Sequence, residues 1–183
     1  MTVKDLTVSY DGKKVLDHTD LSFGDGITCI MGESGIGKTT LLRVIAGLIT
    51  PDSGEVMGAP VKPSLMFQED RLFPWLTALE NVVIVCGDEA KARELLKRVE
   101  LSDALDKYPS ELSGGMKRRV ALARALAYDG DMLILDEPFK GLDEALIQRM
   151  ADLIKTCDLP IIVSTHAESD VSLLSADKVV LKR

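Results

Sequence analysis

Residues 29–47 read CIMGESGIGKTTLLRVIAG, and within this stretch a glycine-rich segment separates two apolar runs. The run 27–31 is long enough for one buried strand, and the run 41–48, which ends before Pro51, predicts a buried helix. Between them, residues 32–39 match the phosphate-loop pattern of two glycines followed by Lys and Thr. A strand, the complete motif and a helix in this order predict a loop that binds the phosphates of a nucleotide.

Each residue type in this loop has a physical role in phosphate binding. The glycines Gly32, Gly35 and Gly37 let the backbone turn and direct its N–H groups inward. The helix that follows points its positive end at the same place. Lys38 adds a cation for the outer phosphates, and the hydroxyl of Thr39 suits Mg²⁺. We therefore expect the phosphates of a nucleotide, together with Mg²⁺, as the ligand.

Composition limits the class of protein. The chain has 183 residues, of which 46% are hydrophobic and 28% charged, as in a single soluble globular domain. Its net charge of −7 argues against a nucleic-acid-binding surface, which would be basic. We expect the basic cluster at residues 117–119 to be a solvated helix face, and Cys29, Cys86 and Cys157 to be buried thiols in a reducing compartment.

No apolar run is long enough to span a membrane, and the N-terminus does not look like a signal peptide. The expected location is therefore the cytoplasm, and a partner must supply any membrane span.

The rest of the chain alternates strand and helix patterns. We expect a β-rich part over residues 3–31 with a turn at Asp11-Gly12, and a loop over 50–63. Further expected elements follow in chain order: a strand at 64–70, helices around 92–99, 120–127 and 147–154, and strands at 132–135, 161–163 and 179–181. This alternation predicts a largely parallel sheet whose ligands bind at the carboxyl ends of its strands.

Polar residues follow several of these strands. Asp136 and Glu137 come directly after an apolar run; Asp136 suits Mg²⁺, and Glu137 can accept a proton from water as a general base. The alternative is that the two acids merely end a strand before a turn, but adjacent buried carboxylates are costly unless solvated or bound to a cation. Gln68 and His166 are expected at the same edge, although each residue alone is a weak signal.

A second anion site is predicted in the stretch LSGGMKRRVALARAL, residues 112–126. Ser113, Gly114 and Gly115 place a hydroxyl and bare backbone N–H groups at a helix start. The alternative is a helix cap that happens to use glycine.

Together these motifs resemble the ATP-binding cassette (ABC) ATPases, the motor subunits of ABC transporters. GESGIGKTT is the phosphate loop, FQED carries the Q-loop glutamine, LSGGM is the family signature, and MLILDEP is the acidic strand. GLD ends at the D-loop aspartate, and STHAE carries the switch histidine. The resemblance implies an α/β fold: a P-loop NTPase core with a mainly parallel sheet, an N-terminal antiparallel β subdomain over about 1–28, and a short α-helical subdomain inserted over about 70–128, all in the single domain 1–183.

The resemblance also implies roles for individual residues. Catalysis would fall to Glu137, His166 and Gln68, and Mg²⁺ would be held by Thr39, Gln68 and Asp136. The residues that would contact ATP include the adenine-stacking aromatic, the phosphate loop, the signature and the D-loop: Tyr10, Gly32, Glu33, Ser34, Gly35, Ile36, Gly37, Lys38, Thr39, Thr40, Ser113, Gly114, Gly115 and Asp143. The signature would face ATP held by a second subunit, which implies a head-to-tail homodimer or a heterodimer with a related ATPase.

The run DRLFPWLTALENV after Gln68 is most similar to importer ATPases of the nitrate, sulfonate and taurine uptake type. This similarity implies a membrane permease as partner and a position on the inner face of the cell membrane. Phe73, Pro74 and Trp75 would contact the permease, although an ordinary hydrophobic loop is the alternative. We expect no nucleic-acid partner.

The sequence departs from the family pattern in places. Met116 replaces the usual signature glutamine, and Lys140 stands where the D-loop motif usually starts with a small residue. The chain is also short, and we expect no C-terminal regulatory domain.

Three alternative functions fit the sequence less well. A soluble ABC ATPase of DNA repair, chromosome maintenance or iron–sulfur assembly is the runner-up, but the repair and chromosome types need a long insertion before the signature. A regulator without turnover would not need Glu137 and His166. A GTPase needs an Asn-Lys-x-Asp motif, and Asn81 is the sole asparagine.

Overall fold

The computed structural model describes residues 1–182, which form two β-sheets and surrounding helices. The strands are β1 (Thr2–Tyr10), β2 (Lys13–Ser22), β3 (Ile27–Met31), β4 (Ser53–Met57), β5 (Pro63–Met66), β6 (Met132–Asp136), β7 (Ile161–Thr165) and β8 (Asp177–Val180). The α-helices are α1 (Lys38–Ile45), α2 (Ala78–Cys86), α3 (Glu89–Arg98), α4 (Gly114–Ala127), α5 (Glu144–Lys155) and α6 (Glu168–Leu174). The expected α/β class, with a parallel and an antiparallel sheet, is confirmed.

The larger sheet has the strand order β5-β6-β7-β3-β8, and each neighbouring pair in it is parallel. Strands β6 and β7 are buried along their whole length, which explains their continuous apolar sequence. Because parallel strands all end at one edge, the loops after them gather there.

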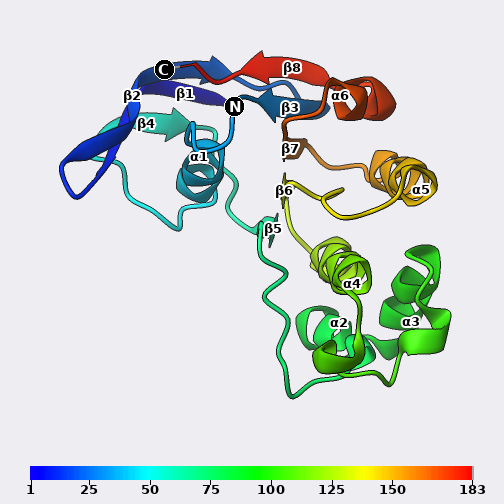
Figure 1. Ribbon diagram of the computed structural model, residues 1–183. Helices are drawn as coiled ribbons and strands as arrows, with labels where there is room; N and C mark the ends of the chain where they lie inside the picture. Colours follow the sequence, from blue (N-terminus) through cyan, green and yellow to red (C-terminus); the bar gives the residue numbers. More distant parts are fainter. Residues whose placement is uncertain (183) are drawn as a thin grey trace.

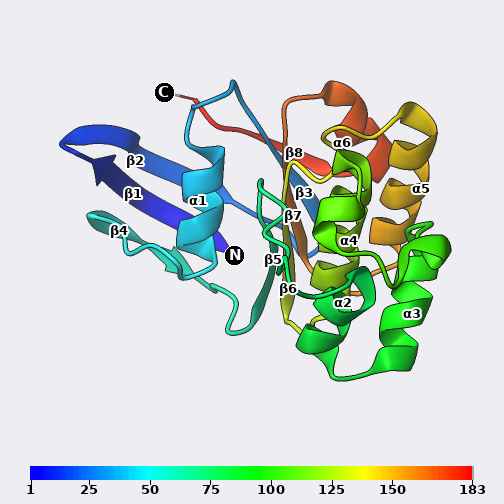
Figure 2. The same cartoon turned by 60° about the horizontal axis from the view of Figure 1, so that its bottom comes forward.

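Alternate residues of the parallel sheet contribute to two separate cores. Ile30 and Ile134 belong to the core under α1 and the antiparallel sheet, whereas their neighbours Cys29 and Leu135 face the core under the other helices. Figure 2 shows α1 between the two sheets and α4, α5 and α6 on the opposite side of the parallel sheet. Helices α2 and α3 pack on α4, and Figure 1 shows them farther from the sheet.

The smaller sheet has the order β2-β1-β4 and is antiparallel. The expectation of a plain loop over residues 50–63 was therefore wrong, because β4 lies within it and pairs with β1. Gly54 has a φ of +84°, and a Cβ there would lie 2.3 Å from the Asp5 carbonyl oxygen, so glycine permits this close pairing. A glycine-rich segment becomes a strand here because β1 supplies its hydrogen-bond partners.

The helices differ from expectation at their ends and in number. Helix α1 ends at Ile45 rather than at residue 48, and α2 and α6 were not expected from apolar periodicity. For α2 a signal existed: the Thr77 hydroxyl accepts from Glu80 N, and the Glu80 carboxylate accepts from Thr77 N, which is a capping box. The expected bounds of the N-terminal and helical subdomains stay a prediction.

The three cysteines are not equally buried. Cys29 is buried in the core, and desolvation raises the pKa of its thiol to about 12. Cys86 and Cys157 are only partly buried, so the expectation of three buried thiols was right for one of them. Within the described residues, no helix combines the length and the apolar character that crossing a membrane requires.

Candidate functional site

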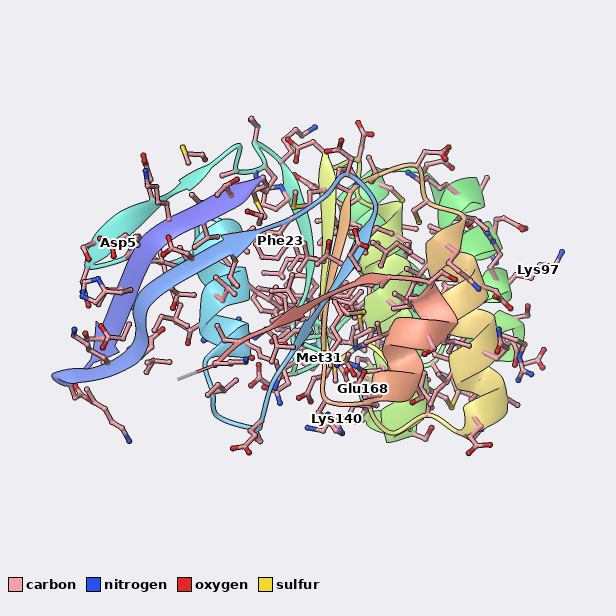
Figure 3. The ribbon with its side chains drawn as sticks, turned by 90° about the horizontal axis from the view of Figure 1, so that it is seen from above. Asp5, Phe23, Met31, Lys97, Lys140 and Glu168 are labelled. Carbon is pink, nitrogen blue, oxygen red and sulfur yellow. The ribbon has the colours of Figure 1, made fainter. Side chains whose placement is uncertain are left out.

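Four loops that follow parallel strands meet at one edge of the sheet. The phosphate loop follows β3, Gln68 follows β5, Asp136 ends β6 with Glu137 directly after it, and His166 follows β7. These four strands are consecutive neighbours in the sheet, so the expected gathering of their loops is confirmed. Figure 3 shows this edge, with Met31 at the end of β3 and Lys140 and Glu168 in the segments after β6 and β7.

The phosphate loop presents the open end of α1. Gly37 precedes the helix with a φ of +114°, and a Cβ there would lie 2.9 Å from the Leu16 side chain and 3.1 Å from the Val15 carbonyl oxygen. The described residues provide no side-chain cap for α1. Its first backbone N–H groups therefore remain available for an anion.

Lys38 is the cation of this loop. Its side chain is buried, and its ammonium donates to the carbonyl oxygens of Gly32 at 2.6 Å and Glu33 at 2.9 Å. An ammonium has three donors, so one remains after these two contacts. Lys38 thus holds the loop closed and carries positive charge at the end of α1.

Asp136 joins the phosphate loop to strand β7. Its Oδ2 accepts from the Thr39 hydroxyl at 2.7 Å, and its Oδ1 accepts from the buried Ser164 hydroxyl at 2.5 Å. Hydroxyl and carboxylate oxygens are ligands that Mg²⁺ prefers, usually together with waters and substrate phosphates. The described residues contain no cluster of three or more His, Cys, Asp or Glu for a metal. The Thr39–Asp136 contact instead places one hydroxyl oxygen beside one carboxylate.

Glu137 has a strained backbone beside this pair. Its φ is +51°, and its N–H donates to the Ser164 carbonyl at 3.1 Å and to the Ser164 hydroxyl at 3.0 Å. Its carboxylate accepts from Gln68 Nε2 at 3.3 Å and lies 3.5 Å from the ammonium of the exposed Lys140. Ser164 was missed in the sequence, where it counted only as part of the histidine motif.

A cavity of about 190 Å³ opens between these groups. It is lined by residues from the phosphate loop, the Q-loop, the acidic strand and the start of β2: Val15, Ser34, Gly35, Gly37, Lys38, Thr39, Thr40, Gln68 and Glu137. The structure thus brings the predicted phosphate loop, Gln68 and Glu137 to one hollow.

Other predicted residues lie outside the lining of this cavity. His166 is exposed directly after β7, and Tyr10 is 44% exposed at the end of β1. Ser113 is exposed and caps α4 by accepting from Met116 N at 3.3 Å, while Asp143 caps α5 by accepting from Leu146 N at 2.9 Å. Within one chain, therefore, the signature and the D-loop aspartate do not line the cavity at the phosphate loop.

Arg118 corrects the expectation for residues 117–119. It is 3% exposed rather than solvated, and its guanidinium donates to the backbone of the Q-loop and of the acidic strand. A signal existed in the sequence, because Arg118, Ala121, Leu122 and Ala125 fall at i, i+3, i+4 and i+7 and are all buried. The arginine lies on the apolar face of α4.

Comparisons with known proteins agree with this geometry. The sequence pattern of the family described as ABC transporter matches residues 16–140. The aliphatic sulfonates import ATP-binding protein SsuB 3 of Paraburkholderia xenovorans is 42% identical over 193 residues, covering 100% of this chain and 76% of that protein. The taurine import ATP-binding protein TauB of Mesorhizobium japonicum is 39% identical, covering 96% of this chain and 77% of that protein.

A solved structure has the same fold. The ATP-binding cassette MJ0796, described as a dimeric post-hydrolysis state bound to ADP and Pi, superposes with a TM-score of 0.88 at 27% identity, covering 99% of this chain and 94% of that one. The resemblance inferred from the motifs is confirmed. The chain belongs to the ABC transporter family and is the ATP-binding, ATP-hydrolysing subunit of such a transporter.

Proposed function

We propose that this chain powers an importer of the sulfonate or taurine type and that it hydrolyses ATP in the cavity beside the phosphate loop. One observation carries the assignment of the site: the Thr39 hydroxyl bonds Asp136 at 2.7 Å beside a hollow that Gln68 and Glu137 also line. The relatives reported above are import subunits, which favours transport over a soluble ABC ATPase of another kind. The cargo itself is selected by the permease and its binding protein.

The triphosphate would lie along the phosphate loop. The open N-terminus of α1 and the Lys38 ammonium would bind the outer phosphates. Lys38 would exchange its contacts to loop carbonyls for phosphate oxygens. Tyr10 would stack on the adenine at the antiparallel sheet.

The residues present fit a magnesium ion. Thr39, Asp136 and Gln68 would hold it through hydroxyl, carboxylate and amide oxygens. When bound, Mg²⁺ neutralises negative charge on the phosphates during phosphoryl transfer.

Hydrolysis would use Glu137 as general base. A water oxygen bonds the γ-phosphorus, the bond from that phosphorus to the oxygen of the ADP leaving group breaks, and the Glu137 carboxylate takes the proton of the water. Gln68, 3.3 Å from that carboxylate, would orient the water. We assign to His166, at the same edge, contact with the γ-phosphate and orientation of Glu137.

A second copy would complete the site. Ser113, Gly114 and Gly115 lie at an exposed helix start outside the cavity of their own chain. A helix N-terminus of this kind binds anions, and a head-to-tail dimer would place it on the γ-phosphate held by the partner. Asp143, which begins α5, would lie at the same dimer interface.

The permease would contact the loop that follows the Q-loop. Trp75 is 69% exposed, and its ring centroid lies 5.6 Å from that of Phe73. The buried Asn81 holds this loop, accepting from Phe73 N at 2.8 Å and donating to the Leu76 carbonyl at 3.0 Å and the Thr77 carbonyl at 2.9 Å. An exposed aromatic on a rigidly held loop is suited to a protein interface.

The decisive experiment is Glu137→Gln, which keeps the size of the side chain but removes the base. We expect turnover to fall about 10²–10⁴-fold while MgATP still binds. Uncleaved ATP should convert the protein from monomer to dimer, as read by size-exclusion chromatography with light scattering. Glu94→Gln, on the exposed face of α3, is the matched control and should behave as wild type. Normal turnover in Glu137→Gln would contradict the assigned base.

The partner surface is tested by Trp75→Ala in a chain co-expressed with a sulfonate-importer permease. We expect weaker co-purification, because truncating a buried interface aromatic often costs about 2 kcal/mol or more, with unchanged MgATP binding. Tyr128→Ala, another exposed aromatic, is the control. Equal recovery of both variants would reject this surface.

A further inference from the structure

We propose that Arg118 is a positioning residue for ATP hydrolysis, which holds the Q-loop and the acidic strand in one fixed relation. This inference rests on the roles proposed above for Gln68 and Glu137. Arg118 lies one turn into α4, the helix that begins at the signature.

One arm of the guanidinium holds the Q-loop. Nη1 donates to the carbonyl oxygens of Phe67 at 2.9 Å and Gln68 at 3.0 Å, and to the Asp70 carboxylate at 3.0 Å. Two of these three acceptors are backbone atoms. The contact therefore determines where the chain at Gln68 lies, whatever its side chain does.

The other arm holds the end of β6. Nη2 donates to the carbonyl oxygens of Asp136 and Glu137, the latter at 2.8 Å. The backbone of Glu137 has a φ of +51°, a conformation that the surrounding contacts must maintain. Arg118 is thus bonded directly to the residue proposed as general base.

One nitrogen of the Arg118 guanidinium has no hydrogen-bond partner in this arrangement. Its Nε is buried and has no hydrogen-bond partner in the described residues, while both Nη atoms are used. A buried charge with an unsatisfied N–H is a poor source of stability, since desolvation opposes it. The arrangement is better explained by the bridge, which needs the rigid planar fork of arginine.

The bridge controls a specific distance. Gln68 Nε2 and Glu137 Oε2 lie 3.3 Å apart, and the backbones of both residues bond the same guanidinium. The pairing of β5 with β6 ends at Met66 and Leu135, and the guanidinium bonds the two backbones beyond that point. A displacement of about 1 Å at a reacting group can reduce a rate about 10²-fold.

Arg124 provides a natural comparison on the same helix. Its guanidinium donates to the Asp70 carbonyl at 2.9 Å and to the Arg71 carbonyl at 2.8 Å, so it also holds this loop to α4. Its recorded hydrogen bonds do not reach β6. Burial lowers the pKa of Arg124, and the nearby Asp70 opposes that shift. Of the two arginines, Arg118 bonds the Gln68 backbone, the Asp70 carboxylate and the backbone of β6, whereas Arg124 bonds the loop after Gln68.

The test compares Arg118→Met, Arg118→Lys and Arg124→Met in the purified chain. Equilibrium MgATP binding and the single-turnover rate at saturating MgATP are measured separately. We expect Arg118→Met to slow hydrolysis about tenfold or more while the MgATP dissociation constant stays within about twofold. Arg118→Lys should hydrolyse ATP faster than Arg118→Met but more slowly than wild type, since lysine keeps the charge but not the planar fork. Arg124→Met should slow hydrolysis less than Arg118→Met.

Several results would overturn the inference. One is an Arg118→Met hydrolysis rate within twofold of wild type. Another is an equal loss of hydrolysis rate in Arg118→Met and Arg124→Met, which would indicate only a loosened Q-loop. If Arg118→Met fails to fold, Arg118→Lys decides: a slower rate at unchanged MgATP affinity supports the bridge, and a wild-type rate rejects it. Glu137→Gln, measured in the same assays, distinguishes a failure of the positioning role of Arg118 from a failure of the general-base role of Glu137. If it is inactive while both Arg118 variants are normal, the positioning role fails and the assigned base stands.

Discussion

Helices α1 and α4 both begin at glycine-rich segments, yet their N-termini have opposite surroundings. The start of α1 is enclosed: Gly37 is packed against Val15 and Leu16, and Lys38 is buried. The start of α4 is exposed: Ser113 caps it, and a Cβ on Gly114 would meet nothing within 4 Å. The start of α1 thus lines a cavity, and the start of α4 is exposed.

This difference indicates how the site is divided. The enclosed end carries its own cation and its own acidic partner, because Thr39 bonds Asp136 within the same chain. At the exposed end the Ser113 hydroxyl caps the helix and Gly114 is open, while a Cβ on Gly115 would lie 3.3 Å from the Gly141 carbonyl oxygen. We therefore expect the end of α1 to bind a nucleotide within one chain, and the end of α4 to need a surface from a second copy.

The largest expected effect is on dimerisation, which should depend on the start of α4 but leave nucleotide binding at the start of α1 unchanged. In a Glu137→Gln background, Ser113→Arg should abolish the ATP-dependent dimer, because a bulky side chain would occupy the position of the partner's γ-phosphate. MgATP binding by the phosphate loop should be unchanged, as read by titration. Ser102→Arg, an exposed serine elsewhere, is the control for added charge. A dimer that survives Ser113→Arg would mean that the exposed end does not face nucleotide.

The next effect concerns the enclosed end alone. Lys38→Ala should weaken MgATP binding about tenfold or more, since charge-assisted hydrogen bonds contribute about 1.5–3 kcal/mol. Isothermal titration measures this directly. Lys97→Ala on the exposed side of α3 should leave the affinity unchanged. Wild-type affinity in Lys38→Ala would remove the phosphate loop from the site.

The smallest effect compares the glycines themselves. Gly37→Ala should lower the free energy of unfolding by about 1 kcal/mol or more, because φ is +114° and the new Cβ meets the Val15 carbonyl oxygen at 3.1 Å. Gly114→Ala should raise it by a few tenths of a kcal/mol, since alanine favours helix and the site is open. Urea unfolding of both variants without nucleotide tests this. Equal changes would show that the two helix starts are packed alike.

The sequence was sufficient for motifs whose residues are contiguous. The phosphate loop, the adjacent Asp136 and Glu137, and Ser113 at a helix start are recognisable because their spacing reflects local backbone geometry. Apolar runs also predicted the parallel strands, since β6 and β7 are buried on both faces. The same reasoning failed for β4, whose strand conformation depends on pairing with β1.

Buried polar residues were the main omission. Ser164, Asn81 and Arg118 each look ordinary in sequence, and each is buried with hydrogen bonds to other segments. Their partners are defined by packing and not by spacing. Asn81 is the clearest case, because a single side chain holds the loop that presents Trp75.

By itself, the sequence determined the chemistry: a phosphate loop, a hydroxyl and a carboxylate for a cation, and an acid able to take a proton. These are properties of residue types at short spacings, which local geometry enforces. Only the tertiary structure decided that Gln68 and Glu137 come within 3.3 Å, that Arg118 bonds the backbone of both, and that the signature lies outside the lining of the cavity at its own phosphate loop. The physical reason is that these relations join residues 19 to 69 positions apart. Their approach depends on how α4 packs against the sheet and not on any local preference.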